Sequence, residues 1–238
     1  MSALAILGPS FVREHLRTRL TLVSLVAIPA FFVLIFASVL GEFSAALGGT
    51  LAEQAATAIS AGWAAAFLAG ALAFFEVVSS RGADRRLALA GLGAGRVALA
   101  RIAAALSLAV IVSAVAFLTL VLRSGIAHPL HAAVAILGFA TIFIGIGALI
   151  GAFISGQLEG SLLVVLVFSV DVFSGPAMTS GGGLLTTLTP TRKAADLLIA
   201  AGSGQGSPGG DWIAVAAVAL GALGVAIAVF WFAARARV

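Results

Sequence analysis

Long apolar runs, separated by short polar links, dominate the sequence. Six of them approach or exceed the length that a helix rising ~1.5 Å per residue needs to cross a bilayer, about 20 residues. They lie at about 20–40, 58–78, 102–122, 130–154, 161–178 and 213–234. The pattern predicts an all-α integral membrane protein with six transmembrane helices, forming a single transmembrane domain over residues 1–238.

The residues before the first run have a different pattern. Gly8, Pro9 and Ser10 suit a helix start, and apolar side chains then share one face while charged side chains point elsewhere. The pattern favours an N-terminal interfacial helix in the headgroup layer, with a frayed tail as the alternative. Pro29 predicts a bend within the first span, more as a matter of packing than of mechanism.

The segment between the fifth and sixth runs is too polar to cross a membrane. Pro190 suits a helix start, and one helical face then carries four apolar residues, Ala194, Leu197, Leu198 and Ala201. We expect short outer helices here, dipping into the outer leaflet.

Composition agrees with a membrane protein. Of 238 residues, 62% are hydrophobic and 9% are charged, and the mean hydropathy is +1.21. The absence of cysteine excludes disulfides and thiolate chemistry. The calculated pI of about 11.3 does not indicate nucleic-acid binding, because the arginines cluster beside apolar runs, where they orient a membrane protein.

The basic residues are unevenly distributed between the links. With a cytosolic N-terminus, the outer links hold only Arg123, Arg192 and Lys193, whereas inner segments hold the other ten of thirteen basic residues. The positive-inside rule therefore predicts that both termini are cytosolic. Trp63, Trp212 and Trp231 lie near predicted span ends, as interfacial tryptophans do.

Candidate chemistry is sparse. No catalytic constellation is evident, so we expect that the chain is not an enzyme. His128 and His131 have no neighbouring cysteine or carboxylate and indicate a water interface rather than a metal site. The glycines from Gly91 to Gly95 lack a preceding strand and a P-loop lysine, and indicate a flexible break instead of a phosphate cradle.

Two acidic residues inside predicted spans are candidates for special roles. Asp171 lies about ten residues from the inner end of the fifth predicted span, where an ionisable group is either functional or held by a structural hydrogen bond. Its partner is not evident from the sequence. Glu76 is close enough in sequence to pair with Arg81 or Arg101 and so anchor the loop between spans two and three, or it is a solvated boundary charge.

The loop between spans two and three holds five basic residues. From Ala83 it reads ADRRLALAGLGAGRVALARIAAA, and a later stretch reads GALIGAFISGQLEGSLLVVLVFSVDVFSGPAM, followed closely by LTTLTPTRKAADLL. With the amphipathic lead-in and six spans, this organisation resembles the type-2 ATP-binding-cassette (ABC) exporter permeases. In that family a coupling helix in this loop docks on a separate ATPase; the family's common Pro after it is replaced here by Gly91 to Gly95.

The resemblance implies a set of partners and roles. The docking residues would be Asp84, Arg85, Arg86, Leu87, Leu89 and Gly91. Glu76 and Arg101 would anchor the loop, and Asp171 is a candidate for the translocation pathway. ATP and Mg would bind to the partner ATPase, and a second permease copy, identical or related, would complete the transporter in a bacterial cytoplasmic membrane. If the loop has no such role, its arginines only set the topology.

Three alternatives remain open. Within the same class, a haem-exporter permease of cytochrome c maturation has a similar size and span count. An ion-coupled carrier would use Asp171 as its proton or ion site. A membrane assembly protein would transport nothing.

Overall fold

The structure is a computed structural model, and it describes residues 19–46, 53–87, 90–91, 93–176, 178, 189–204 and 210–235. These residues are almost entirely helical, and no strand occurs among them. The expected N-terminal interfacial helix lies outside the described residues, apart from Arg19.

The first span is built from three consecutive helical pieces, and the others are single helices. The first comprises α2 (Arg19–Phe31), the π-helical turn η1 (Phe32–Phe36) and α3 (Ala37–Ala46). The remaining helices are α4 (Glu53–Leu87), α5 (Ala94–Ser124), α6 (Pro129–Phe153), α7 (Gln157–Ser174), the shorter α9 (Arg192–Ser203) and α10 (Gly210–Arg235).

Six helical segments are long and apolar enough to cross a membrane: Leu22–Glu42, Glu53–Ser80, Gly95–Ser124, Pro129–Phe153, Gln157–Ser174 and Asp211–Ala228. The predicted fold class, an all-α membrane protein with six spans, is therefore confirmed. Some predicted ends are wrong. The second and third helices begin earlier than expected, because helices extend beyond the part of the sequence that is continuously apolar. The fifth ends at Ser174 instead of about Met178, because Gly175 and Pro176 follow and a proline disfavours the helical conformation of the residue before it.

Helices α4 and α6 form the centre of the bundle. In their most apolar stretches 78% and 72% of residues are buried, compared with 33% or less in the other four spans. Glycine makes this packing close: a Cβ atom added at Gly147 would lie 2.1 Å from the carbonyl oxygen of Gly70, and one at Gly151 would lie 2.8 Å from Val77. Gly147 and Gly151 are four residues apart, a spacing of small residues that lets membrane helices approach closely.

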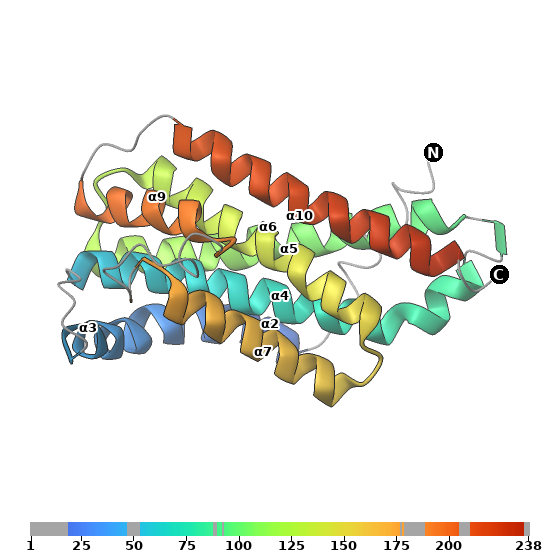
Figure 1. Ribbon diagram of the computed structural model, residues 1–238. Helices are drawn as coiled ribbons and strands as arrows, with labels where there is room; N and C mark the ends of the chain where they lie inside the picture. Colours follow the sequence, from blue (N-terminus) through green and yellow to red (C-terminus); the bar gives the residue numbers. More distant parts are fainter. Residues whose placement is uncertain are drawn as a thin grey trace.

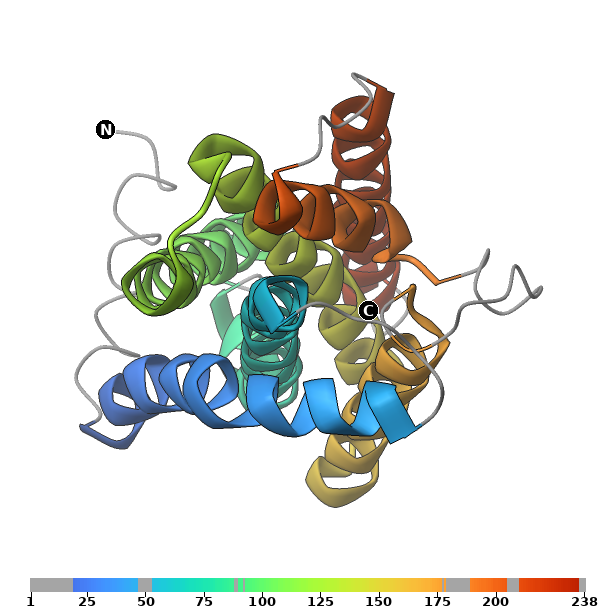
Figure 2. The ribbon, with the colours of Figure 1, turned by 90° about the vertical axis from the view of Figure 1, so that its left-hand side faces the viewer.

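The helices define two ends of the molecule. At one end, on the right in Figure 1, α4 passes into α5 and α10 finishes; we call it the hairpin end. At the other lie α9, the end of α3, the start of α4 and the link from α5 to α6; we call it the α9 end. Seen from the α9 end, the first span crosses the bundle obliquely, whereas α4 and α5 are viewed nearly along their axes (Figure 2).

The helix expected between the fifth and sixth spans is present as α9, which packs against α4, α6 and α10. Its predicted apolar face is buried, including Leu197 and Leu198, each 0% exposed. Leu198 approaches Gly62 of α4, and Ala194 approaches Gly138 of α6. The face is thus covered by protein, because glycines in the central helices make room for it. That α9 lies at the depth of the outer leaflet stays a prediction.

Trp63 also differs from expectation. It is 1% exposed and is among the largest fully buried side chains. It lies inside the core cluster with neighbours from several helices, so it does not face the membrane interface. Its position in the sequence near a span end was misleading, because α4 begins ten residues before it and is the central helix.

Candidate docking hairpin and buried polar contacts

Helices α4 and α5 form a long hairpin whose tip, residues 81–100, lies at the hairpin end (Figure 1). The segment from Arg81 to Ala90 has helical potential in the sequence, and the structure shows residues 81–87 as helix, continuous with α4 from Glu53 to Leu87 instead of a separate short helix. The continuation follows because Ala, Arg and Leu are strong helix formers that extend the membrane helix past its apolar part. The segment is therefore a rigid continuation of the central helix.

The chain reverses at the glycine run. Gly91 and Gly93 have φ values of 95° and 76°, which other residues rarely adopt, and α5 begins at Ala94. Gly91 is exposed in this turn. These glycines form the turn of a helical hairpin, which agrees with the break between helices that the sequence predicted.

The expected docking residues fall into distinct groups. Arg86 is exposed, whereas Leu87 is half-buried and packs against Ala100 and Ala104 of α5. Asp84 and Arg85 belong to the last turns of α4, but their side chains lie outside the described residues, as does the whole of Leu89. Leu87 thus holds the hairpin together, and Arg86 is the expected docking residue whose exposed side chain the structure describes.

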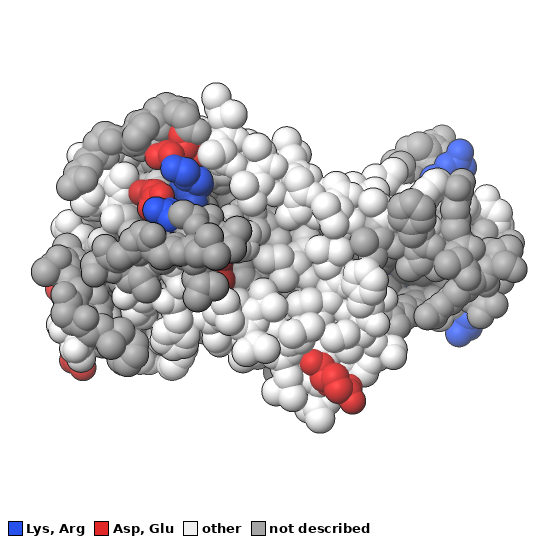
Figure 3. Space-filling model, in the orientation of Figure 1, with Lys and Arg blue, Asp and Glu red and all other residues white. Residues whose placement is uncertain are grey.

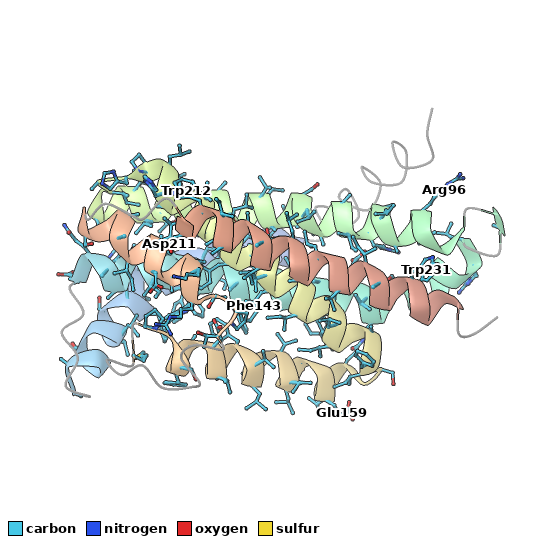
Figure 4. All side chains as sticks on the ribbon, turned by 45° about the horizontal axis from the view of Figure 1, so that its top comes forward. Arg96, Phe143, Glu159, Asp211, Trp212 and Trp231 are labelled. Carbon is cyan, nitrogen blue, oxygen red and sulfur yellow. The ribbon has the colours of Figure 1, made fainter. Side chains whose placement is uncertain are left out.

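Arg96 adds a second exposed basic side chain on the tip. Figure 4 shows it at the hairpin end near Trp231, and a Cβ atom at the adjacent Gly95 would lie 3.9 Å from the Trp231 ring. On the face shown in Figure 3, Lys and Arg appear at the two ends, whereas the middle is largely uncharged apart from an acidic patch at its lower edge. This pattern matches a protein whose middle lies in a bilayer.

A buried ion pair joins the two helices just inside the tip. The Arg101 guanidinium donates from Nη1 to Oε1 of Glu76, and the two residues are 6% and 8% exposed. Arg101 was one of the two arginines considered as partners of Glu76; the side chain of the other, Arg81, lies outside the described residues. A charge pair at this depth ties α4 to α5, because separating the charges would leave both in a medium of low polarity.

Asp171 lies elsewhere, near the α9 end. It is in the last turn of α7, fourteen residues after Gln157, and not in the middle of the span. Its carboxylate is buried, and Oδ2 accepts a hydrogen bond from the Thr191 hydroxyl at 2.5 Å. Oδ1 is also buried and has no hydrogen-bond partner among the described residues. Thr191, which precedes α9, is the partner that could not be identified from the sequence.

A group of surface charges joins α9 to the start of α10. Lys193 Nζ lies 3.2 Å from Oδ1 of Asp211, which is labelled in Figure 4. Burial raises the pKa of Asp196 above its usual 3.8, and the nearby positive charges of Lys193 and Arg192 oppose that rise. This group positions α9 on the bundle.

His128 and His131 pack as aromatic rings. The His131 ring centre lies 4.5 Å from that of Trp212 and 5.3 Å from that of His128. In the part of the chain that the structure describes, no three His, Asp or Glu side chains gather in a group that could hold a metal ion.

One contact was missed from the sequence. Arg123, in the last turn of α5, donates to the Leu34 carbonyl in the π-helical turn and to Ser38 Oγ in α3. The sequence analysis used Arg123 only as an orientation charge. In the sequence, Pro29 was the one indication of this contact, because it predicts a first span that is irregular near Leu34.

Comparison of the sequence with models of known protein families and with curated protein sequences gives no match. The functional proposal therefore depends on the residues and geometry described above.

Proposed function

We propose that this chain is the membrane-spanning permease subunit of an ATP-driven exporter of the type-2 ABC class. It moves a hydrophobic or amphipathic compound out of the cytosol, while a separate subunit binds ATP and Mg and hydrolyses the nucleotide. The hairpin end faces the cytosol, so both termini are cytosolic, in a bacterial cytoplasmic membrane.

The α4–α5 hairpin is the observation that carries the proposal. Its tip presents exposed Arg86 and Arg96, while α4 runs on without a break into the most buried part of the bundle. A push on the tip is therefore transmitted along one rigid helix to the centre of the membrane domain. The Glu76–Arg101 pair makes α5 follow α4.

A transport protein without a nucleotide site of its own needs an outside source of energy for uphill movement. A cytosolic ATPase requires a shaped contact on the permease, and basic side chains on a rigid tip offer charge and fixed position together. An ion gradient requires a binding group within the membrane. The hairpin tip meets the first requirement.

Asp171 gives less support to an ion-coupled carrier. It lies within a turn of the end of α7 and holds Thr191 at the start of α9. A group that loads and releases ions usually borders a water-filled path, whereas this residue is 3% exposed in a helix-to-helix contact. The resemblance to the type-2 ABC exporter permeases also includes a short helix between the fifth and sixth spans, and α9 lies at that place in the chain. The haem-exporter alternative draws no support from any feature particular to it.

The proposal implies that a second permease copy, identical or related, forms the other half of the pathway. The outward side of α7 carries large exposed apolar side chains, among them Leu162, Leu166 and Phe173. Such a surface faces either lipid or another membrane helix.

Co-purification tests the proposal. The full chain, extracted with a mild detergent, is expected to bring down a protein whose sequence contains G-x-x-x-x-G-K-[ST], the phosphate-binding loop of ATPases. The double variant Arg86→Glu/Arg96→Glu should lose this protein, because both reversed charges lie on the tip. Lys193→Glu, at the opposite end, should retain it. Retention by the double variant, or no ATPase with the parent, contradicts the proposal.

A further inference from the structure

A π-helical turn interrupts the first span, whereas each of the other spans is a single α-helix over its described residues. Pro29 lacks a backbone N–H, and the π-helical turn Phe32–Phe36 follows it directly. Both features disturb the regular ladder of helical hydrogen bonds and leave carbonyl groups available to other donors. The turn is packed on the bundle: Val33 is 0% exposed, and the Phe32 ring stacks on Phe67 of α4 with centres 6.1 Å apart.

Arg123 binds to this interruption from α5. Its Nη1 lies 2.5 Å from the Leu34 carbonyl oxygen, and its Nη2 lies 3.1 Å from Ser38 Oγ. Both acceptors are neutral. Among the described residues no carboxylate lies within ion-pair distance of Arg123, so the guanidinium charge has no counter-charge there.

A carboxylate is available one turn further along α3. Leu34, Ser38 and Glu42 follow one another at intervals of four residues, the spacing that brings helical side chains to one face. Glu42 is exposed and makes no ion pair within the described part of the chain. A carboxylate binds a guanidinium more strongly than a hydroxyl or a carbonyl does. The strongest acceptor on this face is thus adjacent to the site that Arg123 occupies.

We propose that the first span has a second position relative to α5, in which it slides along its own axis until Arg123 pairs with Glu42. Bringing Glu42 to the place of Ser38 requires a shift of about one helical turn along the axis of the first span. The first span is less covered by the bundle than α4, because 22% of its most apolar stretch is buried, compared with 78% in α4. Packed helices switch between such discrete registers, whereas closely packed cores keep theirs. This inference does not depend on the proposed transport function.

Distances between spin labels test the two positions. The chain contains no cysteine, so labels on Ala45→Cys in α3 and Ala127→Cys after α5 report only on these sites, both exposed. In the full chain, reconstituted in lipid nanodiscs, pulsed electron paramagnetic resonance is expected to give two distances. They should differ by up to roughly 5 Å, the rise of one helical turn.

Substitutions assign each distance to its contact. Glu42→Gln should leave only the distance that belongs to the contact of Arg123 with Leu34 and Ser38. Ser38→Ala should increase the share of the distance that belongs to the pair of Arg123 with Glu42, because it removes one acceptor of the first contact. Arg123→Gln should replace both distances by one broad distribution. Ser107→Ala, an exposed residue of the same helix whose hydroxyl donates to the Ala103 carbonyl, should leave the parent distribution unchanged.

Two results would overturn the inference. One is a single narrow distance in the parent protein that Glu42→Gln does not alter. The other is a pair of distances that persists unchanged in Glu42→Gln, which would mean that Glu42 stabilises neither position.

Discussion

Breaking the buried pair between Glu76 and Arg101 should destabilise the protein more than removing both charges. The two side chains are 9% and 7% exposed respectively, so neither is well solvated when its partner is removed. Glu76→Leu alone leaves a buried guanidinium, and Arg101→Met alone leaves a buried carboxylate. Removing one member of a buried pair costs about 3–5 kcal/mol, whereas replacing both by apolar side chains is often near neutral.

The assay is thermal unfolding of the purified protein in one detergent. For a domain of this size, a loss of about 3 kcal/mol corresponds to a melting temperature lower by roughly 6–12 °C. Each single variant should show such a drop, and the double variant Glu76→Leu/Arg101→Met should recover most of it. Arg96→Met, an exposed arginine on the same helix, should change the melting temperature little.

The double-mutant comparison also gives the result that would refute this reasoning. If the losses of the two single variants simply add in the double variant, the two charges do not act on each other. If neither single variant is less stable than Arg96→Met, the pair is not buried in the folded protein.

Three further substitutions give separate tests. Gly147→Ala should reduce the free energy of unfolding by about 2 kcal/mol or more, and so lower the melting temperature, because the added Cβ atom meets the backbone of α4. Gly221→Ala should not lower it, because the space around Gly221 is open. Asp171→Ala should impair transport in a flux assay while the chain still assembles in the membrane; unchanged export by a normally expressed variant would show that the carboxylate has no such role. The raised pKa of Asp196 means that its charged form costs stability above that pKa, so Asp196→Asn should raise the melting temperature at neutral pH and give a smaller gain towards pH 3.8; an equal gain at both pH values would contradict this.

Hydropathy and helical periodicity predicted the main architecture. The six spans and the buried face of α9 with Leu197 and Leu198 follow from the order of apolar residues, since burial of apolar surface decides both.

Other features depend on tertiary contacts that no local pattern records. The end of α4 at Leu87 was missed because charge marks where a helix leaves the membrane, not where it stops. Trp63 was placed at an interface because its neighbours in space were unknown. The contact of Arg123 with Leu34 joins residues 89 positions apart, and Thr191 was not identified as the partner of Asp171 for the same reason.

The central claim is that a separate ATPase drives this chain through the hairpin tip. Its most direct test is ATP hydrolysis by the detergent-extracted complex, purified through a tag on this chain and assayed for released phosphate. Parent and Lys193→Glu proteins should carry ATPase activity, and Arg86→Glu/Arg96→Glu should carry little, with equal amounts of chain recovered. No ATPase activity with the parent protein, together with flux in proteoliposomes that a pH gradient drives without ATP, would contradict the claim.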